Sequence, residues 1–223
     1  MNPLQPRVAD PYDKLRLRTA VVETLGAITP PKQDAMVHVI EDWNGAQSAQ
    51  RWWLTKNRLR QDALRGHRIR RSILAQYDLG VVYTIWPGDE SYDTMSRWKP
   101  APRFERTKMG EDVLNEQPTT HWRCITTNLA PLEYVVEIWL TEDGIPMRID
   151  SHVTQRCDGM GVPSEEDTHR CRWLTQEVIR QPVEAARFEL SKELKPRHLR
   201  HKPVFNVGEL SKNTLLRSGR ING

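Results

Sequence analysis

The chain has 223 residues, of which 38% are apolar and 28% charged, and its mean hydropathy is −0.67. The length fits one large domain or two small ones. No apolar run is long enough for a transmembrane helix, which needs about 20 residues. Residues 1–10 also lack the apolar segment that is typical of a signal peptide.

The net charge of +4 is concentrated near the end of the sequence. Residues 189–223 contain eight Lys or Arg and three Glu, which leaves the preceding residues close to −1. We expect a basic C-terminal extension over residues 191–223, either solvated or docked on an anionic surface or a protein partner. Because the rest of the chain is not basic, we do not expect nucleic acid as a partner.

A helix is predicted over residues 11–28. Asp10 can cap its free N–H groups, and Pro11 suits the first helical position. Apolar side chains then recur at helical spacing, at Leu17, Val21, Leu25 and Ile28. Pro30 and Pro31 end the element. Residues 15–18 also alternate, so a strand remains an alternative there.

The following sequence predicts an antiparallel meander. Runs typical of strands occupy residues 35–42, 50–55, 58–64, 68–76, 81–86, 121–127, 134–153 (a hairpin) and 171–179. Asn44-Gly45 is a strong signal for a two-residue hairpin turn, and residues 97–108 read as a surface linker. About eight or nine strands at this spacing favour a barrel or half-barrel. The N-terminal helix would then cover its concave apolar face.

The hairpin at residues 134–153 has a predicted register. If Asp143-Gly144 forms a type I′ turn, Leu140 lies opposite Met147 and Ile138 opposite Ile149. Because side chains alternate between the faces of a strand, one face of this hairpin is apolar and the other is mixed, as in a sheet with one wetted side. The apolar face consists of Tyr134, Val136, Ile138, Leu140, Met147, Ile149 and Val153.

Four phrases of the sequence together resemble one known family. They are WLTKNRLR (53–60), VVYTIWPGDESY (81–92), GEDVLNEQPTTHWR (110–123) and IWLTEDGIPMR (138–148), the third with Glu116 where glycine is usual. In this order they resemble the periplasmic outer-membrane lipoprotein-carrier family (LolA/LolB-like), over residues 35–190. The resemblance implies an incomplete, curved antiparallel β-barrel with helical cover over a hydrophobic cavity, and a non-catalytic protein that binds a lipid or acyl chain.

On this basis we expect an N-terminal arm (1–9), a half-barrel domain (10–190) and the basic extension (191–223). The side chains expected to hold a lipid or acyl chain are Tyr134, Val136, Ile138, Leu140, Met147 and Ile149. The protein would act in the periplasm or cell envelope if a signal peptide was removed. The alternative is an assembly or sensor protein that docks on a partner through its surface and basic tail, without a ligand.

Basic residues are dense in residues 51–71, with Trp52 and Trp53 beside them. They form either the solvated face of a sheet or a site for the anionic group of a lipid. The residues expected to contact such a group are Arg58, Arg60, Arg68 and Arg70.

Catalytic and metal sites are not expected. The sequence has no nucleophile-elbow serine and no phosphate-binding glycine loop, so it predicts neither an enzyme nor a cofactor. His152, Cys157, His169 and Cys171 do not converge in the predicted register or match a zinc motif. Cys157 and Cys171 flank a long loop and either form a disulfide or remain two thiols.

Overall fold

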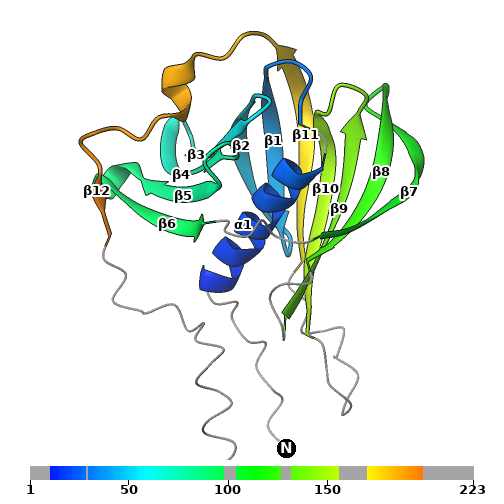
Figure 1. Ribbon diagram of the computed structural model, residues 1–223, viewed down its shortest axis with the longest axis horizontal. Coiled ribbons are helices and arrows are strands. Elements are labelled where there is room, and N and C mark those ends of the chain that lie inside the picture. The colour runs from blue at the N-terminus through cyan, green and yellow to red at the C-terminus, as the bar shows by residue number, and fades with distance from the viewer. Residues whose placement is uncertain (1–10, 29, 98–103, 127–131, 156–169, 198–223) are drawn as a thin grey trace, which may run out of the picture.

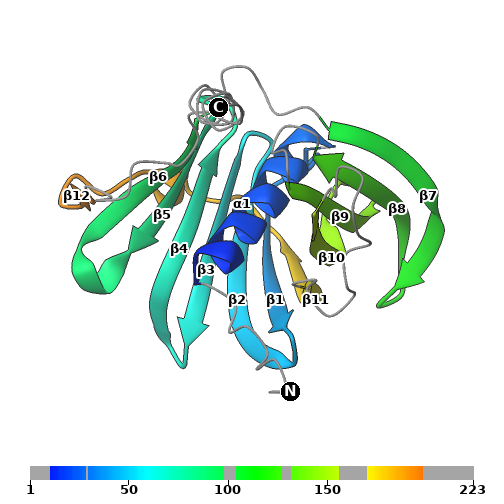
Figure 2. The ribbon, with the colours of Figure 1, turned by 90° about the horizontal axis from the view of Figure 1, so that it is seen from below.

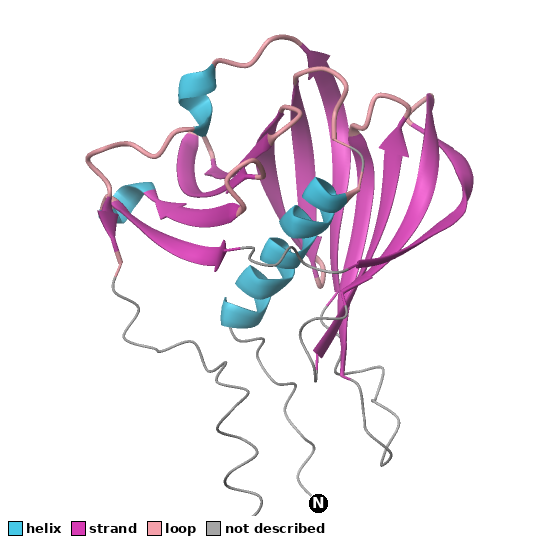
Figure 3. Ribbon diagram, in the orientation of Figure 1, coloured by secondary structure: helices cyan, strands magenta, loops and turns pink. Residues whose placement is uncertain are grey.

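The computed structural model describes residues 11–28, 30–97, 104–126, 132–155 and 170–197. These residues form helix α1 (Pro11–Ala27), one 12-stranded sheet and short 3-10 turns (Figure 3). The helix confirms the prediction over 11–28, and the alternative of a strand at 15–18 is wrong. Within the described residues, no helix is long and apolar enough to cross a membrane.

The sheet consists of two meanders that share one long seam. The first meander contains β1 (Ala35–Trp43), β2 (Ala46–Leu54), β3 (Arg58–Arg65), β4 (Arg68–Gln76), β5 (Val81–Trp86) and β6 (Ser91–Arg97). The second contains β7 (Phe104–Leu114), β8 (Gln117–Thr126), β9 (Leu132–Thr141), β10 (Pro146–Gln155) and β11 (Arg170–Arg180). β1 pairs with β11 and joins the two halves, while β12 (Lys195–Pro196) and β7 are the edges.

The sheet curls around α1 without closing (Figures 1 and 2). Register shifts interrupt five of the strand pairs, β1–β11, β3–β4, β5–β6, β7–β8 and β9–β10. An extra residue in one strand bends it and increases its twist, so these bulges account for the curvature. The mainly β, incomplete barrel with an N-terminal helix as cover is therefore confirmed.

The two predicted hairpin turns differ in outcome. Asn44 and Gly45 have φ of 49° and 86°, as a type I′ turn requires. At the second turn Gly144 has a positive φ of 81°, whereas Asp143 is not among the residues with positive φ. The loop is longer, because the Thr141 N–H bonds the Ile145 carbonyl at 3.0 Å. The type I′ prediction at Asp143-Gly144 is therefore wrong.

The longer loop changes the register only near the turn. Leu140 lies opposite Pro146 instead of Met147, and a bulge follows between Pro146 and Arg148. The bulge restores the predicted pairing of Ile138 with Ile149. The assignment of apolar and mixed faces on β9 is thus preserved.

The predicted linker at 97–108 is wrong for its described part, since β7 begins at Phe104. Strand β6 was also not foreseen. Farther along the chain, residues 183–194 pack on the convex face of the first meander. There the side chain of Phe188, in η3 (Ala185–Phe188), is buried with Trp53, Leu74 and Ile85.

Candidate functional site

The candidate site is the concave apolar face beneath α1. All of the residues predicted to bind an apolar ligand are buried, at most 4% exposed: Tyr134, Val136, Ile138, Leu140, Met147 and Ile149. All of these except Met147 belong to one core cluster with Leu17, Val21 and Leu25 of α1. In this structure the helix itself covers the face that the sequence assigned to a ligand.

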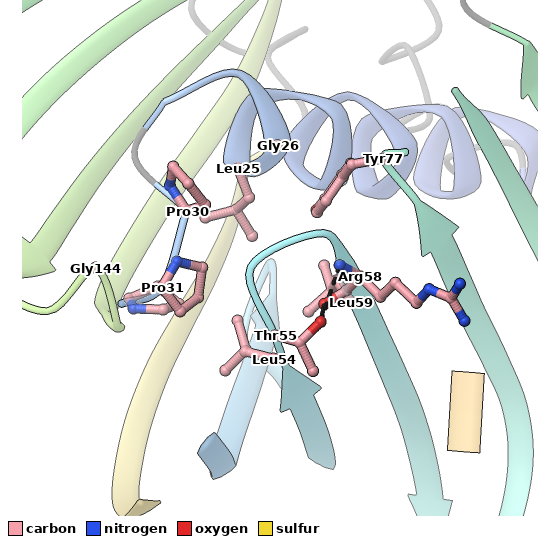
Figure 4. Close-up of a pocket in the computed structure, with 11 residues that line it drawn as sticks. Leu25, Gly26, Pro30, Pro31, Leu54, Thr55, Arg58, Leu59, Tyr77 and Gly144 are labelled. Atoms are coloured by element: carbon pink, nitrogen blue, oxygen red, sulfur yellow. Dashed lines mark hydrogen bonds between the residues drawn. The ribbon is translucent and has the colours of Figure 1, made fainter. Parts of the chain in front are cut away.

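A pocket of about 20 Å³ opens at the C-terminal end of α1, enough for about one water molecule. Figure 4 shows Leu25, Pro30 and Pro31 on one side of it and Leu54 and Leu59 on the other. In the described part of the chain, side chains of α1 therefore occupy the concave face on which an acyl chain would lie.

Tyr77 fixes the C-terminal half of α1 at this pocket. Its hydroxyl donates a hydrogen bond to the Val22 carbonyl at 2.9 Å, and its ring lies against Gly26. Burial, and then the nearby charge of Glu23, raise the pKa of the Tyr77 hydroxyl well above its usual value. The neutral hydroxyl is thus a stable donor to the helix.

A buried ion pair holds the middle of α1. The guanidinium of Arg18 forms a two-pronged pair with the carboxylate of Glu41 on β1. Ser48 Oγ donates to the same carboxylate at 3.0 Å, and Cys171 Sγ lies 3.6 Å from it. Charge is therefore present inside the interface between helix and sheet, where desolvation offsets much of the attraction.

Asp143 connects the β9–β10 turn to the segment between α1 and β1. Its carboxylate accepts hydrogen bonds from Arg180 at 2.7 Å and Gln33 at 2.9 Å, and also from Thr141, and its carbonyl accepts from the Lys32 N–H at 2.9 Å. Burial raises the pKa of Asp143, but these hydrogen bonds outweigh it and hold that pKa well below its usual range. The exit of α1 is thus tied to the sheet.

The predicted arginines do not converge on the concave face. Arg58 contributes to the pocket wall, but its guanidinium extends away from the other lining side chains (Figure 4) and pairs with Asp78 at 3.4 Å. Arg60 bonds Asp62 on the convex side, and Arg68 and Arg70 are exposed at the far end of the β3–β4 hairpin. Contact of these four residues with an anionic group stays a prediction.

The buried charged residues of the site were missed from the sequence. Arg18 sits in a helix without a clear polar face, and Glu41 was assigned to an ordinary strand. A third charged residue of this face, Arg71, could have been found from the sequence. Strand alternation places it on the same face as Ile73 and Ala75, which are buried in the core.

The cysteine and metal predictions are tested only in part. Cys171 is buried, whereas Cys157 and His169 lie outside the described residues, so the disulfide stays a prediction. The described part of the chain contains no group of three or more His, Cys, Asp or Glu side chains suited to a metal ion.

The basic C-terminal extension is described only to Arg197. Lys195 and Pro196 pair with β6, and Arg197 pairs with Asp89 at 2.7 Å and lies over the ring of Trp86. Docking through the remaining basic residues, from 198 onward, stays a prediction.

Comparisons with known proteins find similar structures at low sequence identity. No protein-family model and no curated protein matches the chain. An uncharacterized conserved protein from Thermus thermophilus matches with a TM-score of 0.45 and 10% identity, over 82% of this chain and 99% of that one. A putative outer membrane lipoprotein-sorting protein domain from Vibrio parahaemolyticus matches with a TM-score of 0.40 and 8% identity, over 78% of this chain and 95% of that one. A chain of the Pseudomonas aeruginosa MucA/MucB complex matches with a TM-score of 0.43 and 13% identity, over 83% of this chain and 62% of that one.

Proposed function

We propose that this is a non-catalytic binding protein that holds the apolar chain of a lipid or acylated molecule against the concave face, in a lipid-trafficking role of the cell envelope. The observation that carries the proposal is that one helix covers this apolar face. Among the described residues, no backbone hydrogen bond joins α1 to a strand. The helix is thus a separate layer, and an apolar chain can take its place without breaking the sheet.

An apolar chain on the concave face would bury the same sheet side chains that α1 buries, which offsets part of the cost of releasing the helix. Removing apolar surface from water contributes about 25 cal/mol per Å², whether a helix or an alkyl chain does it. The buried pair of Arg18 and Glu41 stabilises the closed state less than apolar packing of equal volume, because both charges are desolvated. The pocket between Leu25 and Leu59 gives the chain a point of entry at the end of the helix.

The proposal is tested by titrating the purified protein with a neutral pyrene-labelled hexadecanol and measuring probe fluorescence. Ile138→Asp places a carboxylate in the centre of the concave face and is expected to abolish uptake. The matched control is Leu174→Asp, because Leu174 is 37% exposed on the other face of β11 and should leave uptake unchanged. Circular dichroism confirms that both variants are folded. Retained uptake in a folded Ile138→Asp variant would contradict the proposal.

A further inference from the structure

Arg71, in the basic region of residues 51–71, is less exposed than Arg68 and Arg70 beside it. In the β3–β4 register it lies opposite Ala63, two residues before Ile73, which lies opposite Gln61. Ile73 belongs to the core beneath α1, so Arg71 shares the concave face with it. Arg68 and Arg70, on the same hairpin, are exposed, whereas Arg71 is partly buried.

Arg71 has two positively charged neighbours and one negatively charged neighbour. The neighbouring charged groups that act on it are Arg18, Glu41 and Arg70. Burial first, and then the charge of Arg18, lower the pKa of Arg71 to about 10. The guanidinium therefore lies where its positive charge is poorly solvated and is repelled by a second arginine.

Glu41, the carboxylate that the described residues place near Arg71, already has several partners. Both oxygens of Glu41 accept from Arg18, and Ser48 and Cys171 approach them as well. A carboxylate has about four lone-pair sites, so little acceptor capacity remains for a second guanidinium. Among the residues that the structure describes, none accepts a hydrogen bond from Arg71.

We propose that Arg71, beside the Arg18–Glu41 pair, is the anchor for the carboxylate or phosphate group of an amphiphile whose apolar chain lies on the concave face. A partly buried cation without an acceptor among the described residues is costly, and a planar guanidinium binds carboxylate and phosphate oxygens in pairs. The position of Arg71 at the edge of the apolar core requires the anion to carry an apolar chain. This inference rests on the proposed function and names the head group that the site recognises.

The test compares four ligands by isothermal titration calorimetry: dodecanoate, dodecanol, acetate and inorganic phosphate, each below its aggregation limit. The wild-type protein is expected to bind dodecanoate roughly tenfold more tightly than dodecanol, as one charge-assisted pair provides. Acetate and phosphate should bind much more weakly, because they lack the chain. If acetate or phosphate bound as tightly as dodecanoate, the proposal of an amphiphile would be wrong and the site would be one for a free anion.

Variants assign the preference to Arg71. Arg71→Gln should remove the preference for dodecanoate over dodecanol, and Arg71→Lys should keep part of it. The matched control is Arg68→Gln, which changes an exposed arginine of the same hairpin and should keep all of it. A preference that survives in Arg71→Gln would overturn the inference. Failure of dodecanol to bind at all would instead contradict the proposed function, so the two failures are distinguishable.

Discussion

The ring of Tyr77 lies so close to Gly26 that a Cβ atom at residue 26 would stand 2.3 Å from Tyr77 Cε1. The approach is possible because glycine has no Cβ atom. Together with the hydrogen bond from the Tyr77 hydroxyl to the Val22 carbonyl, the contact seats the C-terminal half of α1 on the turn after β4. The strength of this contact determines how readily the helix leaves the concave face.

Tyr77→Phe is expected to increase the apparent affinity for a neutral apolar probe. The substitution removes the hydroxyl that holds α1 and leaves the apolar face unchanged, so the open state becomes more populated. A hydrogen bond of about 1 kcal/mol corresponds to roughly a fivefold change in apparent affinity. Tyr83→Phe is the control, since Tyr83 stacks edge-on with Tyr92 on the other face of the sheet. Unchanged affinity in Tyr77→Phe would show that uptake does not require the hydrogen bond between Tyr77 and α1 to break.

Gly26→Ala is expected to destabilise the protein, although alanine favours helix by about 1 kcal/mol over glycine. The new methyl group overlaps the Tyr77 ring, and overpacking of this kind costs roughly 1–3 kcal/mol. Urea denaturation measures the effect. Gly88→Ala is the control, because nothing lies within 4 Å of a Cβ atom at residue 88. A stabilised Gly26→Ala variant would mean that α1 is not seated against Tyr77.

Asp143 gives the protein an acid-sensitive contribution to stability. Its hydrogen bonds with Arg180, Thr141 and Gln33 lower its pKa in the folded state. A group of this kind stabilises the fold above its unfolded pKa of about 3.9, and that stabilisation is lost as pH falls toward the folded value. Asp143→Asn should therefore be less stable than wild type at pH 7, with a difference that shrinks below about pH 4. Urea midpoints at pH 7 and pH 3 measure both. A constant difference would contradict the role of the carboxylate charge.

Glu116 lies in a backbone conformation that suits glycine. Asn115 and Glu116 have φ of 47° and 62° at the β7–β8 turn, and a non-glycine residue there costs roughly 1 kcal/mol. Glu116→Gly should raise the free energy of unfolding by about that amount. The opposite change, Gly45→Glu in the β1–β2 turn, should lower it, since Gly45 has φ of 86°. Thermal unfolding of both variants tests the pair.

Elements with strong local signals were predictable from the sequence. The Asp10-Pro11 start and the Pro30-Pro31 stop bound α1, and β4 and β5 have the predicted limits of 68–76 and 81–86. Strand β7 was missed because it is a sheet edge whose side chains are mostly exposed, so it shows no apolar alternation. β12 has two residues and depends on pairing with β6, which no local pattern reports.

The site was less predictable because it depends on contacts between distant residues. The apolar face of β9 and β10 follows from alternation, and its burial under α1 confirms that it faces the interior. The turn at Asp143 could not be predicted, because that residue bonds the segment before β1 as well as Arg180 of β11. The pairing of Arg18 with Glu41 joins residues 23 positions apart in different elements, beyond any local pattern.

The most direct test of the account is amide hydrogen exchange of the whole protein with and without saturating dodecanol. If an apolar chain takes the place of α1, amides of residues 15–27 should exchange faster with dodecanol bound. Amides of β9 and β10 should exchange no faster, because the sheet stays intact under the new occupant. Unchanged exchange of α1 at saturation would contradict the account and show that the helix is a permanent part of the core.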